Sequence, residues 1–193
     1  MFADAMPLPA RLVAATEADT GRRAPQSPMN EAKFEAFYRR NAGSLWSYLY
    51  RLTSDASAAD DLLQKTFYRF IRANPETESD EHTRRYLFRT ATNLTFDHFR
   101  DKKRERDAAP IERDASSRAE NVDLRHDMTR VFSELKPRER AILWLAHVEE
   151  SSHDEISRAL GVKSRSVRVL LFRARRRLAD VLRKYGLAPK ELV

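Results

Sequence analysis

The positively charged side chains of this 193-residue chain are its most prominent functional groups, and two segments concentrate them. Residues 163–184 carry nine Lys and Arg against one Asp, a net of +8. Residues 84–106 carry eight against three acidic residues, a net of +5. The whole chain has a net charge of +7, which leaves −6 for the remainder. Such concentrated charge predicts a polyanion partner, because a spread-out excess would serve only solubility.

The spacing of residues 152–178 predicts how the more basic segment is presented. Ser152 and Glu155 fit a capping box at the start of a short helix, and Gly161 suits the positive-φ residue at its end. A longer basic helix follows, with Ser164 as its expected N-cap. A short helix, a glycine-containing turn and a longer basic helix together indicate a helix-turn-helix.

The longer helix of this motif has an apolar face and a cationic face. At about 100° per residue, its later apolar residues fall within about 60° of Val167, whereas Arg165 and Arg176 fall on the opposite side. In a helix-turn-helix the second helix enters the major groove, and its N-terminal residues reach the base edges. We therefore expect contacts to duplex DNA from Ser164, Arg165, Ser166, Arg168, Arg173 and Arg176. The alternative interpretation is a solvated basic helix at the end of a bundle.

Residues 84–106 mix their cations with aromatic side chains. The aromatic residues of this segment are Tyr86, Phe88, Phe96, His98 and Phe99. Cations follow a phosphate backbone and exposed rings stack on unpaired bases, so the composition suits single-stranded or melted DNA. The alternative, that most of these rings belong to the core, stays open at this point.

The composition disfavours an enzyme. The chain has no Cys, which excludes disulfides and Cys-ligated metal sites, and it has no Gly-rich phosphate loop. Its five His are scattered, and neither a nucleophile elbow nor a converging carboxylate pair occurs, so we expect no catalytic site, metal or cofactor. No apolar run approaches about 18 residues and no secretory signal is recognisable, so we expect a cytoplasmic protein without membrane insertion.

Helical periodicity and breaker residues predict an all-α fold of two small helical domains joined by a flexible linker. No strand pattern of period two persists, and Ser57 is the expected N-cap of the second helix. The predicted segments are a disordered N-terminal extension (1–30), a first domain (31–104), the linker (105–118), a second domain with the helix-turn-helix (119–185) and a C-terminal tail (186–193).

The sequences of the two predicted domains resemble those of a known family. The first domain contains FYRRNAGSLWSYLYRLTSDASAADDLLQKTFYRFIRA and RRYLFRTATNLTFDHFRDKKR, which resemble region 2 of the extracytoplasmic-function (ECF) sigma factors of the sigma-70 family. The second contains LKPRERAILWLAHVEESSHDEISRALGVKSRSVRVLLFRARRRLADVL, which is similar to their region 4. The resemblance implies a transcription initiation factor, a dissociable subunit that binds core RNA polymerase and promoter DNA. It also implies an anti-sigma factor as a further partner.

The resemblance assigns roles to particular positions. It implies that region 4 reads the −35 duplex, and that loop 74–82 and Asn93 lie where the family captures a flipped base of the −10 element. The other residues that match the −10 segment are Asp97, Arg100, Lys103 and Arg104. The residues that match the polymerase-binding helix are Asp60, Asp61, Leu62, Leu63, Gln64 and Phe67.

Some positions depart from the family pattern. Lys65 stands where Glu is usual, Tyr86 replaces a usual Trp, and Val169-Leu170 stands where Ser-Arg is common. Val169 belongs to the outward face of its helix, so a thymine methyl or a protein partner are both open as its contact.

A different class of protein also fits part of the pattern. A dimeric helix-turn-helix regulator that acts without docking to polymerase would bind a palindromic site through residues 152–178. That alternative leaves the second basic segment, 84–106, without an explanation.

Overall fold

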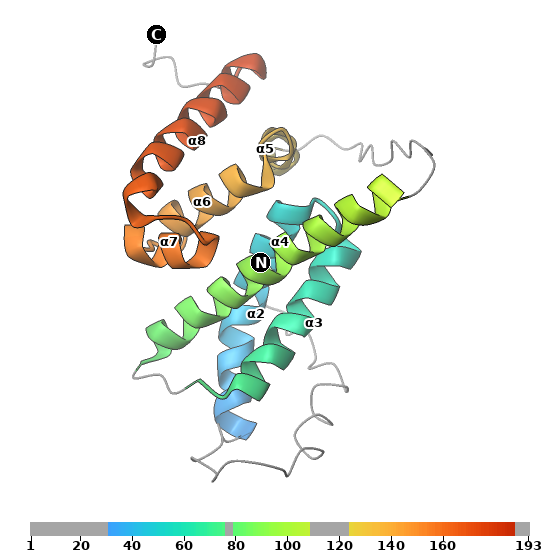
Figure 1. The fold of residues 1–193 in the computed structure, drawn as a ribbon, viewed down its shortest axis with the longest axis vertical. Helices are drawn as coiled ribbons and strands as arrows, with labels where there is room; N and C mark the ends of the chain where they lie inside the picture. The colour runs from blue at the N-terminus through green and yellow to red at the C-terminus, as the bar shows by residue number, and fades with distance from the viewer. Residues whose placement is uncertain (1–30, 76–78, 109–123, 188–193) are drawn as a thin grey trace.

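The computed structural model of the chain describes residues 31–75, 79–108 and 124–187. Within these ranges every regular element is an α-helix, which confirms the predicted fold class (Figure 1). None of the helices is both long enough and apolar enough to cross a membrane. In chain order they are α2 (Glu31–Thr53), α3 (Ala56–Ala73), α4 (Asp80–Ala108), α5 (Leu124–Ser133), α6 (Pro137–His147), α7 (His153–Leu160) and α8 (Ser164–Lys184).

Several predicted segments lie outside the described residues. These are the extension 1–30, part of the loop 74–82 (76–78), most of the linker (109–118) and the end of the tail (188–193). The first residues of the predicted linker are helical, because α4 continues to Ala108. The last eight residues of α4, 101–108, contain Lys, Arg, Glu and Ala, which are good helix formers.

The start of α3 differs from the prediction. Asp55, not Ser57, is the N-cap, and its carboxylate accepts a hydrogen bond from the Ala58 amide at 3.1 Å. That bond, helped by Lys102 3.6 Å away, lowers the pKa of the Asp55 carboxyl. Asp and Ser are comparable caps, so residue type alone did not decide between two candidates two residues apart.

Helices α2, α3 and α4 share one part of the core. Leu45, Leu49 and Phe67 are completely buried where the three helices meet. A 2.8 Å hydrogen bond between the hydroxyls of Tyr48 and Thr92 joins α2 to α4 inside this part of the core. Burial raises the pKa of the Tyr48 phenol, so this bond stays between two neutral groups.

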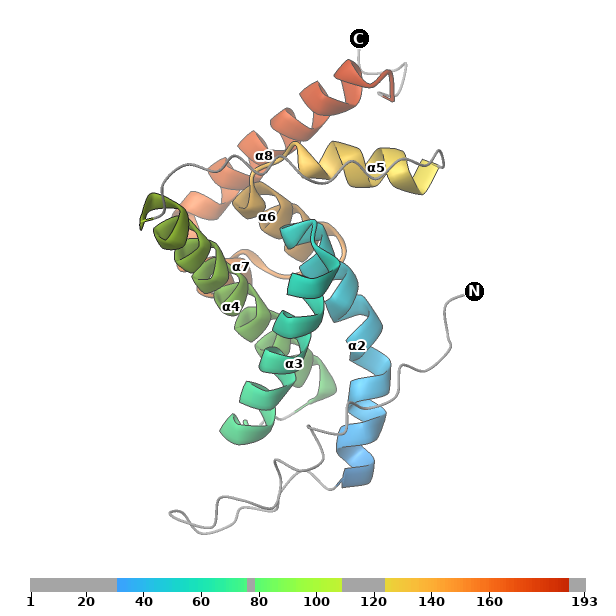
Figure 2. The same ribbon diagram turned by 90° about the vertical axis from the view of Figure 1, so that its right-hand side faces the viewer.

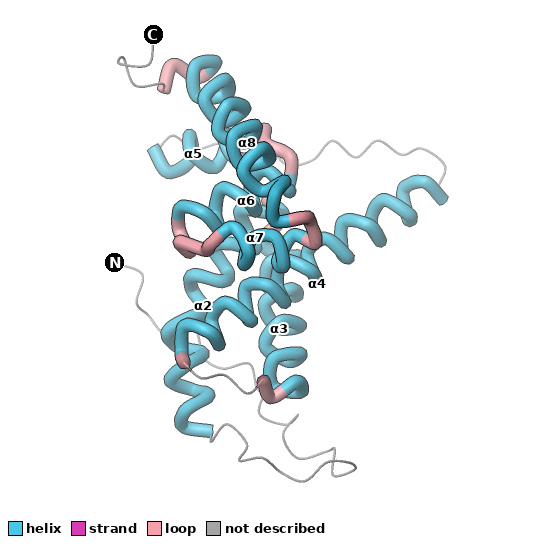
Figure 3. The backbone as a smooth tube through the Cα atoms, turned by 60° about the vertical axis from the view of Figure 1, so that its left-hand side comes forward, coloured by secondary structure: helices cyan, strands magenta, loops and turns pink. Residues whose placement is uncertain are grey.

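The remaining helices form the other end of the molecule. Figure 2 shows α5, α6 and α8 together at one end, with α2 and α3 extending to the other. α8 packs on α5, α6 and α7, and α7 in turn packs on α4, as Figure 3 also shows. The two predicted domains are therefore in direct contact, which the sequence patterns did not indicate.

Arg140, at the start of α6, ties the two halves together. It is 8% exposed, and its guanidinium lies between the C-terminal ends of α2 and α5. The last carbonyls of a helix lack partners within the helix and carry its negative dipole end, so a cation stabilises them. Within 2.8–3.0 Å it donates to the carbonyls of Arg51, Leu52, Ser133 and Leu135 and to the Ser54 hydroxyl.

Glu149, just after α6, makes the second junction between the halves. Its side chain is 5% exposed and accepts two hydrogen bonds from the Arg84 guanidinium, at 2.8 and 2.9 Å. Arg84 also donates to Asn41 at 2.6 Å and lies 4.8 Å above the ring of Phe88. Bidentate pairing of this kind fixes the orientation of both groups as well as their separation.

We predict that Arg140→Met lowers the free energy of unfolding by about 2–4 kcal/mol, because it leaves several buried carbonyls without their charged donor. Chemical denaturation of the full chain measures the effect. Arg177→Met is the matched control, since Arg177 is exposed on α8, and we expect a change within about 0.5 kcal/mol. Equal stability of the two variants would contradict the structural role given to Arg140.

Candidate nucleic-acid interface

Local hydrogen bonds build the turn between α7 and α8 as the sequence predicted. Ser152 and Glu155 form the capping box, and Gly161 ends α7 with a φ of 61°. The expectation that Ser164 caps α8 is wrong. Lys163 occupies the N-cap position without a side-chain bond, and the Ser164 hydroxyl instead donates to Asp154 at 2.6 Å, joining the two helices of the motif.

The same turn is held to α4 by charge. Glu155 on α7 forms an ion pair of 2.8 Å with Arg85 on α4, in the other half of the molecule. Partial burial would raise the pKa of the Glu155 carboxyl, but the hydrogen bonds from Ser152 and the charges of Arg85 and Arg158 outweigh it and lower the pKa. The motif is thereby fixed with α7 inward and α8 outward.

α8 separates its apolar and cationic residues as expected. Val167, Leu171, Ala174 and Val181 are buried against the preceding helices. Of the residues predicted to contact duplex DNA, Ser166 is half-buried and the others are exposed, namely Ser164, Arg165, Arg168, Arg173 and Arg176. None of these four arginines forms an ion pair with any residue that the structure describes. Their charges are therefore available to an external partner.

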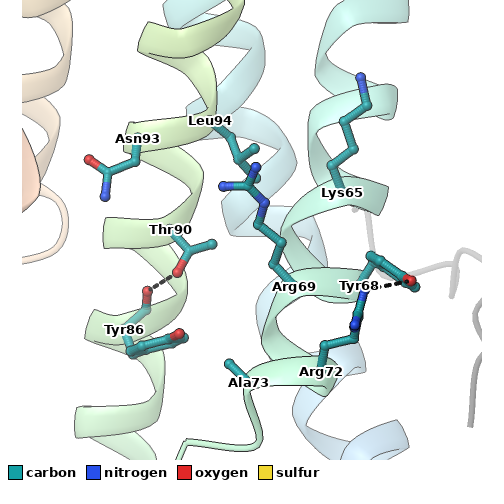
Figure 4. Close-up of a pocket in the computed structure, with 9 residues that line it drawn as sticks. All are labelled: Lys65, Tyr68, Arg69, Arg72, Ala73, Tyr86, Thr90, Asn93 and Leu94. Carbon is teal, nitrogen blue, oxygen red and sulfur yellow. Dashed lines mark hydrogen bonds between the residues drawn. The ribbon is translucent and has the colours of Figure 1, made fainter. Parts of the chain in front are cut away.

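A second basic surface, an open cleft of about 590 Å³, lies between α3 and α4 (Figure 4). Arg69 extends from α3 into the space between the helices, and the ring of Tyr86 projects from α4 toward α3. Arg72 lies with its guanidinium 5.8 Å from the centre of the Tyr68 ring. The lining residues are Lys65, Tyr68, Arg69, Arg72, Ala73, Tyr86, Thr90, Asn93 and Leu94.

The cleft brings together residues that sequence reasoning had treated separately or not at all. Asn93 and Tyr86 were singled out, whereas Arg69 and Arg72 were missed. Lys65, Arg69 and Arg72 recur at helical spacing on α3, but a face shared by two helices is visible only after they pack. Lys65, which the sequence marked as a departure from the family pattern, lines this cleft as a cation.

The other residues expected to handle the −10 strand follow Asn93 along α4. Asp97 is half-buried and paired with Arg100, while Lys103 and Arg104 are exposed.

The aromatic residues of α4 divide between the two interpretations left open by the sequence, that they stack on bases or that they belong to the core. Phe88 is 2% exposed and belongs to the core, whereas the half-buried Tyr86 has its ring at the cleft.

The segment expected to bind polymerase has two faces. Asp60, Asp61 and Gln64 are exposed, and Asp60 accepts a 2.6 Å hydrogen bond from the Trp46 indole. The other three predicted residues are buried in the core, namely Leu62, Leu63 and Phe67. In this conformation a partner reaches only the polar face, and the buried residues act by holding α3 in place.

In the residues that the structure describes, no three His, Asp or Glu converge as metal ligands.

Comparison with known proteins shows that the segments carrying both surfaces match models of one protein family. Residues 37–105 match the family model "Sigma-70 region 2" and residues 125–178 match "Sigma-70, region 4", together more than half of the chain. Similar curated proteins include the ECF RNA polymerase sigma factor SigM of Bacillus subtilis, 28% identical over 152 residues, with 75% of this chain and 91% of SigM covered.

A second relative is the ECF RNA polymerase sigma factor SigE of Mycolicibacterium smegmatis, 31% identical over 163 residues. That match covers 79% of this chain and 63% of SigE. Among solved structures, the sigma factor RpoE of Bartonella quintana, crystallised with the anti-sigma factor NepR, has a similar fold. Its TM-score is 0.62 at 23% identity, covering 78% of this chain and 96% of RpoE. With region 2 and region 4 in the family order and ECF factors as relatives, this chain belongs to the sigma-70 family as an ECF sigma factor.

Proposed function

We propose that this chain binds core RNA polymerase and directs transcription initiation by reading two promoter elements with two separate surfaces. The exposed face of α8 reads the −35 duplex, and the cleft between α3 and α4 holds melted −10 DNA. The observation that carries the proposal is the presence of two distinct cationic surfaces, one on a recognition helix and one in an open cleft, in a chain with sigma-70 regions 2 and 4.

The chemistry of α8 supports duplex recognition. Ser164 and Arg165 are exposed in its first turn, which is the part of a recognition helix that reaches base edges. Arg168, Arg173 and Arg176 follow along the same helix and suit the phosphates on either side of the groove. Phosphate contacts position a protein on DNA, whereas base contacts specify the sequence, so these two groups have different expected effects.

The chemistry of the cleft supports single-strand binding. Lys65 and Arg69 provide cations for the backbone, and Tyr86 provides a ring on which an unpaired base can stack. The Asn93 amide has both donors and acceptors, which suits the polar edge of a base. Extruding a base costs a few kcal/mol of unstacking, and contacts of this kind offset that cost.

α3 has a place for polymerase as well as for DNA. Its N-terminal part exposes Asp60, Asp61 and Gln64, and its C-terminal part contributes the cations of the cleft. We assign the acidic part to core polymerase, so that one helix connects enzyme and melted strand. The two functional units are 31–104 and 119–185, and the chain acts in the cytoplasm, as a factor without enzymatic activity of its own.

We also propose that an anti-sigma factor binds this chain. The support is the family resemblance together with the exposure of Asp60, Asp61 and Gln64, which a competitor of polymerase would cover. Co-purification from the native host tests this point, and recovery of the chain with polymerase alone would contradict it.

The central test is run-off transcription with core polymerase and the purified chain. We expect initiation at specific promoters only when both are present, and only weak DNA binding by the chain alone. A dimeric regulator would instead protect a palindromic site without polymerase and would support no initiation, and that result would reject the proposal.

We predict that substitutions separate the surfaces. Arg165→Ala should weaken binding of the −35 duplex by about 1–3 kcal/mol and relax its sequence specificity, because it removes a base contact. Arg168→Ala should weaken binding of every duplex about equally and lower the salt dependence by about one counterion, because it removes a phosphate contact. Both variants should keep their affinity for core polymerase. Asp61→Ala should weaken polymerase binding and spare the duplex. Fluorescence titrations with each partner measure both affinities. Unchanged polymerase affinity after Asp61→Ala would remove that residue from the docking surface.

We predict that Arg69→Ala reduces the salt dependence of single-stranded −10 DNA binding by about one counterion, because it removes one phosphate contact. Titrations of the polymerase-bound chain at several salt concentrations give the slope. Arg39→Ala is the matched control, since Arg39 is exposed on α2 and paired only locally with Glu35. Equal slopes for the two variants would exclude Arg69 from the strand path.

A further inference from the structure

The outward face of α8 carries two large apolar side chains that nothing in the described structure covers. Val169 is 49% exposed and Phe172 is 63% exposed. Phe172 is the most exposed large hydrophobic residue in the ranges that the structure describes. Single exposed apolar residues are common on protein surfaces. Two of them side by side on one helix face form an apolar patch, and such patches mark interaction sites.

The two side chains form a continuous stripe with arginines at both ends. Residues three and four apart on a helix are surface neighbours, so Val169 adjoins Phe172, Arg165 precedes Val169 by four positions, and Arg176 follows Phe172 by four. Arg168 and Arg173 flank the stripe on its two sides. The whole face lies opposite the buried residues of α8, so it is directed away from the rest of the protein.

The partner of this face must therefore be an anion with apolar groups set into it. All four arginines lack ion pairs with described residues, so the stripe is surrounded by available positive charge. The major groove of DNA meets both requirements, because phosphates line its walls and the C5-methyl group of thymine is the apolar feature on its floor. The position of the stripe in the first three turns of a recognition helix favours the same partner.

We propose that Val169 and Phe172 read thymine methyl groups in the −35 element and so set part of the promoter specificity of this protein. This inference rests on the proposed function of α8 and adds to it the kind of base that the helix selects. Neither side chain has a hydrogen-bonding group, so each recognises thymine through its methyl and cannot recognise a polar base edge.

The test begins with core polymerase and the full chain, selecting promoters from a template library with a randomised −35 region. Each selected thymine is then replaced by deoxyuridine, which removes only the methyl group. We expect one or two thymines at which this change weakens promoter binding about fourfold, as burial of one methyl group predicts. In Val169→Ala or Phe172→Ala the same replacement should have a much smaller effect.

Val148→Ala is the matched control. Val148 is 53% exposed but lies at the C-cap of α6, so its variant should keep the full deoxyuridine effect. Both α8 positions are exposed, and circular dichroism should show unchanged folding. Persistence of the full deoxyuridine effect in Val169→Ala and Phe172→Ala would overturn the inference.

Two further outcomes identify what has failed. If no thymine is sensitive to deoxyuridine but Arg165→Ala still weakens −35 binding, the inference fails and the proposed function of α8 stands. If neither change affects promoter binding and Val169→Ala instead weakens binding to polymerase or to a co-purified protein, the face is a protein-docking surface and both the inference and the −35 assignment fail.

Discussion

The satisfaction of helix ends at the junction of the two halves is the constraint on which the arrangement of this protein depends. α2 and α5 end close together, and carbonyls from both ends come within reach of a single side chain. Arg140 satisfies both ends with one guanidinium that is almost completely buried. Because the geometry of a guanidinium is rigid, these bonds fix how α6 meets α2.

The position of α6 then determines how the two basic surfaces, on α8 and in the cleft between α3 and α4, are placed. With Arg140 in place, Glu149 reaches Arg84 and Glu155 reaches Arg85, so α7 is held on α4. α8 packs on the outer side of α7 and keeps its arginine-rich face exposed. The cleft between α3 and α4 involves other side chains of α4, so both surfaces are accessible in the same conformation.

In this arrangement the basic residues form two groups, one that stabilises the fold and one that presents positive charge to a partner. Arg84, Arg85 and Arg140 have their charges matched by carboxylates or carbonyls, and they hold the protein together. Arg165, Arg168, Arg173 and Arg176 on α8 form no ion pair with the described residues, and they provide the positive field that a polyanion encounters. A net charge summed along a segment combines the two groups, so the +5 of residues 84–106 overstates what that segment offers to DNA.

Features that depend on near neighbours along the chain could be predicted from the sequence. The capping box at Ser152, the positive φ of Gly161 and the two faces of α8 follow from spacings of a few residues, and the structure confirms them. The α3 cap and the role of Ser164 were wrong, because two candidate caps lay close together in the first case and a tertiary partner, Asp154, took the hydroxyl in the second.

Contacts between residues far apart in the chain became visible only when the helices packed together. Arg140 lies 88 residues from Leu52 along the chain and Glu149 lies 65 from Arg84, and no local pattern encodes either contact. The same packing buried Leu62, Leu63 and Phe67, left Asp60 and Asp61 exposed, and joined Arg69 to Tyr86 in one cleft. Sequence periodicity shows which face of a helix is apolar, but the availability of a charge depends on what that face packs against.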